Sequence, residues 1–165
     1  MKKKILRLIS FCVIAFFLFG CGKRVIGPVP GVNLSSGSAA LRHSVVKTAR
    51  AQIGKPYRWG GASPGRGFDC SGLVWWVYRR HGIDVPRVSW QQKYAGRAVP
   101  ESSIKAGDIV LFKVPGQGKS LHTGVYSGNG YSFIHSPKSG SVVREESMKN
   151  NYWRKYYIGA RRIIQ

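Results

Sequence analysis

The sequence predicts a single α+β domain over residues 40–165, in which helices come first and strands follow. In the first half of this range, apolar residues recur at helical spacing. In the second half, short β-branched and aromatic runs are separated by glycine turns. A range of this length suits one compact core, and it contains no internal repeat and no second domain boundary.

The first 20 residues have the pattern of an export signal. Four of the first seven residues are Lys or Arg, and residues 8–19 are almost wholly apolar. That run is shorter than the roughly 20 residues of a spanning helix. It ends in Leu18-Phe19-Gly20-Cys21, which resembles the bacterial lipobox. We expect residues 1–20 to be a lipoprotein signal peptide and Cys21 to be lipidated; the alternative is an ordinary secretory signal with an incidental cysteine.

Residues 21–39 are expected to be the lipidated cysteine and a flexible tether. From Gly22 to about Gly37 the chain is rich in Gly, Pro, Ser and Val and shows no periodicity. A flexible segment of about 20 residues spans roughly 25 Å, so the domain would work close to its membrane. Because Gly22 and not Asp follows Cys21, we expect a cell-envelope location on the periplasmic face of the outer membrane if the organism is Gram-negative.

The three cysteines resolve to one free thiol. Processing at the lipobox would remove Cys12 and convert Cys21 to a thioether, which leaves Cys70 without a disulfide partner. Outside the cytosol, an unpaired cysteine is a chemical liability unless it is buried or used. The surroundings of Cys70 therefore decide its role.

Two helices are predicted before the strands. The first covers Leu41–Ile53, and the second begins near Cys70 and ends at His81-Gly82. Cys70 then lies in the first turn, capped by Asp69, where free backbone N–H groups and the helix dipole would lower the thiol pKa. The alternative is a small buried cysteine that only packs in the core. Position alone does not choose between the two.

The strand-like runs form the second half of the domain. They cover Ile109–Phe112, Leu121–Tyr126 and Tyr131–His135. Asn129-Gly130 favours a two-residue hairpin turn, which pairs Gly124 with His135 and puts His122 one diagonal step away on the same face. Diagonal neighbours lie about 7 to 8 Å apart, within reach of two imidazoles. A three-residue turn would put the two histidines on opposite faces.

A thiol at a helix start and two histidines on one strand face are the parts of a cysteine hydrolase. One imidazole takes the thiol proton and later protonates the leaving amine, while a third polar group orients it. We assign Cys70 as nucleophile, His122 as base and His135 as orienter. Either histidine alone would more simply be a core or surface residue, and the pairing is what favours catalysis.

Local motifs carry a family resemblance. They are PYRWGG around Tyr57, DCSGLV around Cys70, PR at 86–87, GDIVLF from 107, HTGVYSG from His122, FIHS at His135 and the C-terminal YWRKYYIGARR. Together they resemble the NlpC/P60 peptidoglycan hydrolases, particularly the small lipoprotein endopeptidases. The resemblance implies a papain-like α+β fold in which the nucleophile helix packs on an antiparallel sheet. It also implies amide hydrolysis in peptidoglycan stem peptides or crosslinks through a thioacyl intermediate, with Tyr57 beside the Cys70 N–H at the oxyanion.

Other side chains are candidates for the substrate cleft, and each has a packing or capping explanation as well. They are Trp59, Asp69, Ser71 and Arg87. We expect no cofactor and no metal, because the chain has no HExxH and no CxxC, and one thiol with separated histidines makes a poor zinc set.

The chain is strongly basic. Its formal net charge is +21, and removal of the signal, with four of the 27 basic and none of the six acidic residues, leaves +17. Such a charge indicates a polyanionic environment, so we expect peptidoglycan and, through the lipid on Cys21, a membrane as partners. Nucleic acid is not expected, because no zinc-finger, RNP-like or basic heptad signature is present. We expect a monomer. Two alternatives stay open: a non-catalytic peptidoglycan-binding lipoprotein and a thioacyl-dependent acyltransferase.

Overall fold

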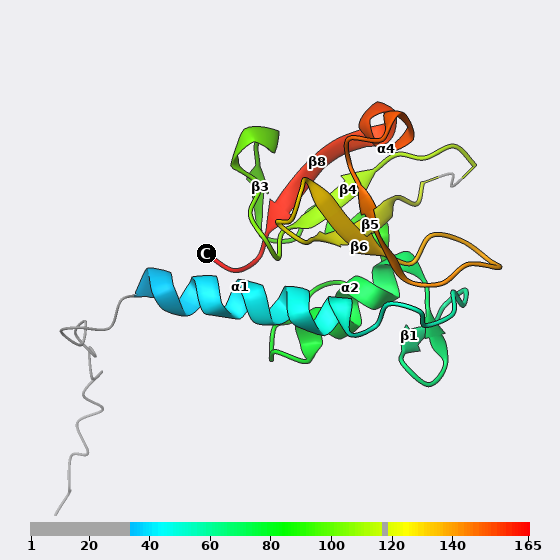
Figure 1. Cartoon of the computed structure of the whole chain (residues 1–165), viewed down its shortest axis with the longest axis horizontal. Coiled ribbons are helices and arrows are strands. Elements are labelled where there is room, and N and C mark those ends of the chain that lie inside the picture. Colours follow the sequence, from blue (N-terminus) through cyan, green and yellow to red (C-terminus); the bar gives the residue numbers. More distant parts are fainter. Residues whose placement is uncertain (1–33, 117–118) are drawn as a thin grey trace, which may run out of the picture. The chain divides into compact units, whose positions relative to one another are not determined.

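A six-stranded antiparallel sheet forms the centre of the protein in the computed structural model, which describes residues 34–116 and 119–165 (Figure 1). The strand order is β3-β8-β4-β5-β6-β7. The strands are β3 (Arg97–Val99), β4 (Ile109–Phe112), β5 (His122–Tyr126), β6 (Ser132–His135), β7 (Arg144–Ser147) and β8 (Tyr157–Arg162). The predicted signal peptide, Cys21 and nearly all of the tether lie outside the described residues.

Helices precede and interrupt the strands. They are α1 (Leu34–Arg50), α2 (Cys70–Arg79), α3 (Ser89–Gln92), the 3-10 turn η1 (Glu101–Ser103) and α4 (Asn151–Tyr156). Helices α1 and α2 pack against each other and against β5 (Figure 1). A small hairpin of β1 (Ala62–Ser63) and β2 (Gly67–Phe68) leads into α2. The predicted α+β class, with helices packed on an antiparallel sheet, is confirmed.

Strand β4 shows why the sheet lies in the middle of the core. Its residues alternate between two apolar clusters, as the period of two in a strand requires. Ile109 and Leu111 pack with the helices, whereas Val110 and Phe112 pack with Trp153 of α4 on the other side. All four β4 side chains are buried, so this strand is wholly apolar rather than half polar.

Helix α1 starts earlier than expected. The predicted start was Leu41, but the helix begins at Leu34 and ends at Arg50, followed by a turn through Gly54 with φ of +89°. The predicted tether includes the first residues of α1, up to residue 39, because this part of the sequence is rich in Ser and Gly. Ser and Gly have low helix propensities, but the free-energy cost per residue is small once a helix is established. Within this segment, Arg42 Nη1 donates to Ser38 Oγ at 3.2 Å.

The β5–β6 hairpin keeps the predicted register with a longer turn. Tyr126 pairs with Phe133, as expected. Between these strands, the backbone has positive φ at Gly128, Gly130 and Tyr131, so the connection is not the two-residue turn expected at Asn129-Gly130. Because the longer turn adds an even number of residues, side-chain parity is unchanged.

The described residues contain no candidate membrane span. Neither residues 34–116 nor residues 119–165 include a helix that is long and apolar enough to cross a bilayer.

Candidate active site

Asp69 begins helix α2 and so positions Cys70. Its backbone is extended, and its side chain accepts a hydrogen bond from the Gly72 N–H at 2.6 Å and one from Ser71 Oγ at 3.2 Å. These are the contacts of an N-cap, which satisfies backbone donors that the helix itself cannot pair. Cys70 is therefore the first residue of α2.

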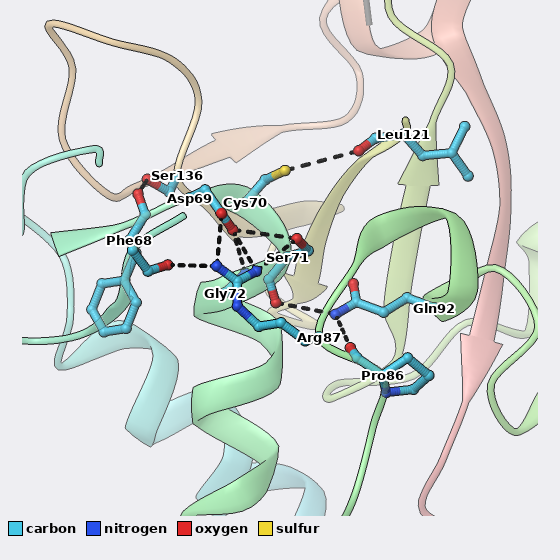
Figure 2. Close-up of polar contacts among 11 residues, drawn as sticks. Phe68, Asp69, Cys70, Ser71, Gly72, Pro86, Arg87, Gln92, Leu121 and Ser136 are labelled. Atoms are coloured by element: carbon cyan, nitrogen blue, oxygen red, sulfur yellow. Dashed lines mark hydrogen bonds and ion pairs between the residues drawn. The ribbon is translucent and has the colours of Figure 1, made fainter. Parts of the chain in front are cut away.

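Arg87 fixes this helix start from a separate segment (Figure 2). Its Nη1 and Nη2 donate to the two oxygens of Asp69 at 3.0 and 2.8 Å, the bidentate geometry that gives the strongest ion pairs. Arg87 also donates to the Gly61 carbonyl at 3.2 Å and to Ser71 Oγ at 3.1 Å. The polar groups of Asp69 and Arg87 are thus used in holding the loop and helix together.

Two further side chains clamp the same region (Figure 2). Gln92 is fully buried, and its Nε2 donates to the carbonyls of Ser71 at 3.1 Å and Pro86 at 2.8 Å. Ser136, just after β6, donates from Oγ to the Phe68 carbonyl at 2.7 Å. Neither residue could be assigned a role from the sequence, because isolated Gln and Ser side chains carry no motif.

The Cys70 thiol is half-buried beside the start of β5. Its Sγ lies 3.8 Å from the Leu121 carbonyl, which is placed to accept the S–H (Figure 2). Burial, with a smaller effect of the Asp69 carboxylate, raises the thiol pKa to about 11. Backbone N–H groups of Thr123, Ser71 and Cys70 act in the opposite direction. The expected lowering of this pKa is therefore wrong. Desolvation of the thiolate outweighs its stabilisation by the backbone N–H groups at the start of the helix, so the resting group is a neutral thiol.

The two histidines of the β5–β6 hairpin meet inside the protein. His122 Nε2 lies 2.8 Å from His135 Nδ1, and the rings are nearly perpendicular at 89°. Both side chains are buried. Burial lowers the pKa of both, and the neighbouring His135 further lowers that of His122. At neutral pH both rings are therefore uncharged.

The histidine pair and the thiol are related through the chain: the cleft over Cys70 is lined by Leu121, whereas His122 lines an adjoining cavity. His122 directly follows Leu121, whose carbonyl meets the Cys70 Sγ. Because Nε2 of His122 is engaged by His135, Nδ1 is the ring nitrogen left to accept a proton. A neutral thiol and a neutral imidazole can react together when the thiol loses its proton during attack.

A cleft of about 380 Å³ opens over Cys70. Its lining includes every residue that the sequence predicted for the cleft. These are Tyr57, Trp59, Asp69, Ser71 and Arg87. Trp59 is 84% exposed, so it stands at the rim. Burial raises the pKa of Tyr57, with added effects of Cys70 and Asp69, and its hydroxyl remains a donor at neutral pH.

The cleft is also lined by residues that no sequence pattern indicated. They are Gly60, Val88, Ser89, Trp90, Ser120, Leu121 and Pro137. Ser89 accepts a hydrogen bond from the Leu121 N–H at 3.0 Å, which ties α3 to the strand beside the thiol. The nearest sequence signal was Pro86-Arg87, which immediately precedes this segment. Within the described ranges, no group of three or more His, Cys, Asp or Glu side chains is arranged to hold a metal ion.

Residues 54–162 match the sequence profile of the NlpC/P60 family. The chain is 42% identical over 144 residues to the murein DD-endopeptidase MepH of Escherichia coli, an alignment that covers 80% of this chain and 53% of the relative. It is 39% identical over 140 residues to the bifunctional muramidase/DL-endopeptidase CwlT of Bacillus subtilis, covering 84% and 42%. A crystal structure of an NlpC/P60 family protein from Bacillus cereus superposes with a TM-score of 0.69 at 34% identity, covering 75% and 40%.

The helix-borne thiol, the paired histidines on the sheet and these matches define the class: the chain belongs to the NlpC/P60 family. It spans about half the length of the curated relatives just described.

Proposed function

We propose that this protein is a cysteine endopeptidase that hydrolyses amide bonds in peptidoglycan peptides. The single observation that carries the proposal is the hydrogen-bonded His122–His135 pair. His122 directly follows Leu121, whose carbonyl contacts the Cys70 thiol at the start of α2. Membership of the NlpC/P60 family supports the substrate class.

In the proposed reaction, Cys70 Sγ attacks the carbonyl carbon of the scissile amide. The thiol proton passes to Nδ1 of His122 during attack, because a thiol with a pKa of about 11 is not ionised beforehand. His122 then delivers this proton to the leaving amine, which departs as the C–N bond breaks. Water, deprotonated by His122, attacks the thioester, releases the carboxylic acid and restores the thiol.

Two donors are proposed for the oxyanion. The backbone N–H of Cys70 is one of the unpaired donors at a helix start. Tyr57 lines the cleft with Cys70, and its raised pKa keeps the hydroxyl proton in place. Such donors contribute most when they face the oxygen that becomes negative in the transition state.

The relatives differ in the bond that their names state. The MepH name specifies a DD-endopeptidase and the CwlT name a DL-endopeptidase. An enzyme acting on the bond between two D-centres would open crosslinks, whereas one acting on a D–L bond would shorten stem peptides. Product masses separate these two results.

The test is mass spectrometry of fragments released from purified peptidoglycan by the protein and by its Cys70→Ser and Cys70→Ala variants. We expect new amine and carboxyl termini from the wild type only. Ligated products in place of free termini would instead identify an acyltransferase. Release by the variants at the wild-type rate, or tight binding without any release, would contradict the peptidase and favour the binding lipoprotein.

We propose further that the protein is a lipoprotein of the cell envelope, anchored through Cys21. The support is the sequence alone: the basic and apolar residues 1–19, the lipobox-like Leu18–Cys21 and the Gly- and Pro-rich segment that follows. Its test is the mass of the protein from membranes, which should carry the added acyl chains. Cys21→Ser should abolish the added mass and release the protein from membranes.

A further inference from the structure

We propose that Glu146 is a positioning residue that sets the tautomers of both histidines and thereby leaves Nδ1 of His122 free to act as the base. The catalytic meaning of this inference depends on the proposed function. The tautomer itself does not, because it is a property of the resting protein.

Three neighbouring strands bring the groups into line. His122 lies on β5, His135 on β6 and Glu146 on β7. On the β6–β7 pair, His135 is opposite Arg144 and Phe133 is opposite Glu146, so Glu146 is a diagonal neighbour of His135 on the same face. His135 Nε2 lies 3.5 Å from Glu146 Oε2. Within the described part of the chain, this buried nitrogen has no closer hydrogen-bond partner.

The short contact between the rings allows two proton arrangements. In the first, His122 donates from Nε2 to Nδ1 of His135, and His135 carries its own proton on Nε2. In the second, His135 donates from Nδ1 to Nε2 of His122, and His122 carries its proton on Nδ1. Only the first arrangement leaves Nδ1 of His122 with a lone pair for the thiol proton.

The carboxylate of Glu146 distinguishes the two arrangements. In the first, the N–H of His135 lies beside a negative oxygen, with Nε2 3.5 Å from Oε2, an electrostatic attraction without the geometry of a hydrogen bond. In the second, the lone pair of His135 Nε2 faces that oxygen, and two acceptors oppose each other in a buried setting. Glu146 therefore favours the first arrangement at His135, and the 2.8 Å contact transmits that choice to His122.

Glu146 is itself held ionised and in place. The Trp153 indole donates to Oε2, and Arg144 pairs with Oε1. The interaction with His135, followed by those with Trp153 and Arg144, lowers the pKa of Glu146 to about 2 although burial opposes it. The charged or titratable groups around it are His135 on β6, Arg144 on β7, and Lys138 and His122 on the wall of the adjoining cavity. From α4, Trp153, which does not titrate, contacts Glu146, and Tyr152 lines the same cavity.

The same arrangement serves the charged stage of the reaction. When His122 takes the thiol proton it becomes an imidazolium within a buried, low-dielectric environment. His135 then accepts from the charged ring while its own Nε2–H stays beside Glu146, so the positive charge is balanced by a fixed carboxylate two groups away. Only six of the 165 residues are acidic, and Glu146 is the one that faces this pair.

The experiment measures histidine tautomers by ¹⁵N NMR in the purified, uniformly labelled protein, together with kcat and KM on peptidoglycan peptides. We expect His122 and His135 of the wild type to be protonated at Nε2. Glu146→Gln should populate the Nδ1-protonated forms of both rings, because it removes the negative charge that opposes the lone pair of His135 Nε2. Carboxylates that orient metal-bound histidines are worth about 10- to 100-fold in activity, so we expect kcat to fall by about that factor with KM nearly unchanged.

Two further variants test whether the effect is specific to the carboxylate of Glu146. Glu145→Gln removes the same charge from the next position of β7, where Glu145 pairs with Arg50, and should change neither tautomer nor kcat. Glu146→Asp keeps the carboxylate and should retain the wild-type tautomers with an intermediate kcat. Nδ1 protonation of His122 in the wild type, or unchanged tautomers and kcat in Glu146→Gln, would overturn the proposal. Failure of the proposed function shows separately, as activity that survives Cys70→Ala.

Discussion

Arg87 holds the cap of helix α2 through both carboxylate oxygens of Asp69, at 3.0 and 2.8 Å. The pair joins segments 18 residues apart in the chain. It is partly buried, with side-chain exposures of 31% for Arg87 and 14% for Asp69. Because Cys70 follows Asp69 directly, this ion pair sets where the thiol lies relative to the cleft.

Replacing Arg87 by Lys should destabilise the protein by about 1–2 kcal/mol, because a single ammonium cannot reproduce the bidentate pair and the contact with the Gly61 carbonyl. Urea unfolding measures the change. Arg66→Lys, an equivalent change at an exposed position of the loop before α2, is the control and should leave the midpoint unchanged. Equal midpoints for both variants would show that the bidentate contact of Arg87 with Asp69 does not contribute to stability.

Gly72 should tolerate no side chain. A Cβ placed there would stand 2.1 Å from the Gly61 carbonyl oxygen and 2.9 Å from both Arg87 Nη2 and Asp69 Oδ1. Gly72→Ala should therefore cost about 2 kcal/mol or more and lower kcat, since relief of the clash moves the start of α2. Gly65→Ala is the matched control, because nothing lies within 4 Å of its Cβ. Thermal unfolding and activity on peptidoglycan peptides measure both effects.

The thiol should react with alkylating agents like a group of high pKa. With the pKa of Cys70 raised to about 11, mainly by burial, the thiolate fraction rises about tenfold per pH unit through the neutral range. We expect the rate of iodoacetamide modification at Cys70, followed by peptide mass spectrometry, to climb without a plateau from pH 7 to 10. N-acetylcysteine in the same buffers calibrates the reagent. A rate that is already flat below pH 8 would indicate a preformed thiolate–imidazolium pair instead.

The elements that carry the candidate catalytic groups could be predicted from the sequence. The predicted strand Ile109–Phe112 matches β4 at both ends. The β5–β6 register followed from the turn signal at Asn129-Gly130. Gly124 leaves room opposite His135, because a Cβ there would lie 3.1 Å from His135 Cβ. The longer turn leaves the same side chains on the same face of the sheet, so the two histidines are in contact as expected.

Features that depend on pairing between strands far apart in the chain could not be predicted. Strand β8 pairs with β3 and β4, both far back in the chain, and no local pattern encodes such partners. Glu146 escaped notice for a related reason. Residues 136–143 join β6 to β7 without a motif that fixes the register, and a shift of one residue would put Glu145 on the histidine face instead. The thiol pKa was mispredicted because burial depth follows from packing of the whole fold.

Stability should fall in mild acid because of the two histidines. Burial lowers the pKa of His122 and His135 below the ordinary value of 6.5. Between 6.5 and the lower folded values, the unfolded chain binds more protons, so stability is fully present above pH 6.5 and is lost as the pH drops below it. Urea midpoints measured from pH 8 to 5 should show this decline. His135→Asn should flatten it, whereas a midpoint independent of pH in the wild type would contradict buried neutral rings.

Salt should separate attachment to the wall from chemistry. Without residues 1–20 the chain would carry a net charge of +17. Lysines line the grooves next to the cleft, among them Lys93, Lys119 and Lys138. If polyanions of the wall hold the enzyme, raising salt from about 0.1 to 1 M shortens the screening length from about 10 to 3 Å and weakens that hold. We expect activity on intact sacculi to fall several-fold while activity on a small soluble peptide stays constant.

The double variant Lys93→Gln/Lys119→Gln should reduce the salt dependence of activity on sacculi and leave peptide hydrolysis unchanged. Equal salt sensitivity on both substrates would show that the charge acts on folding or catalysis and not on attachment.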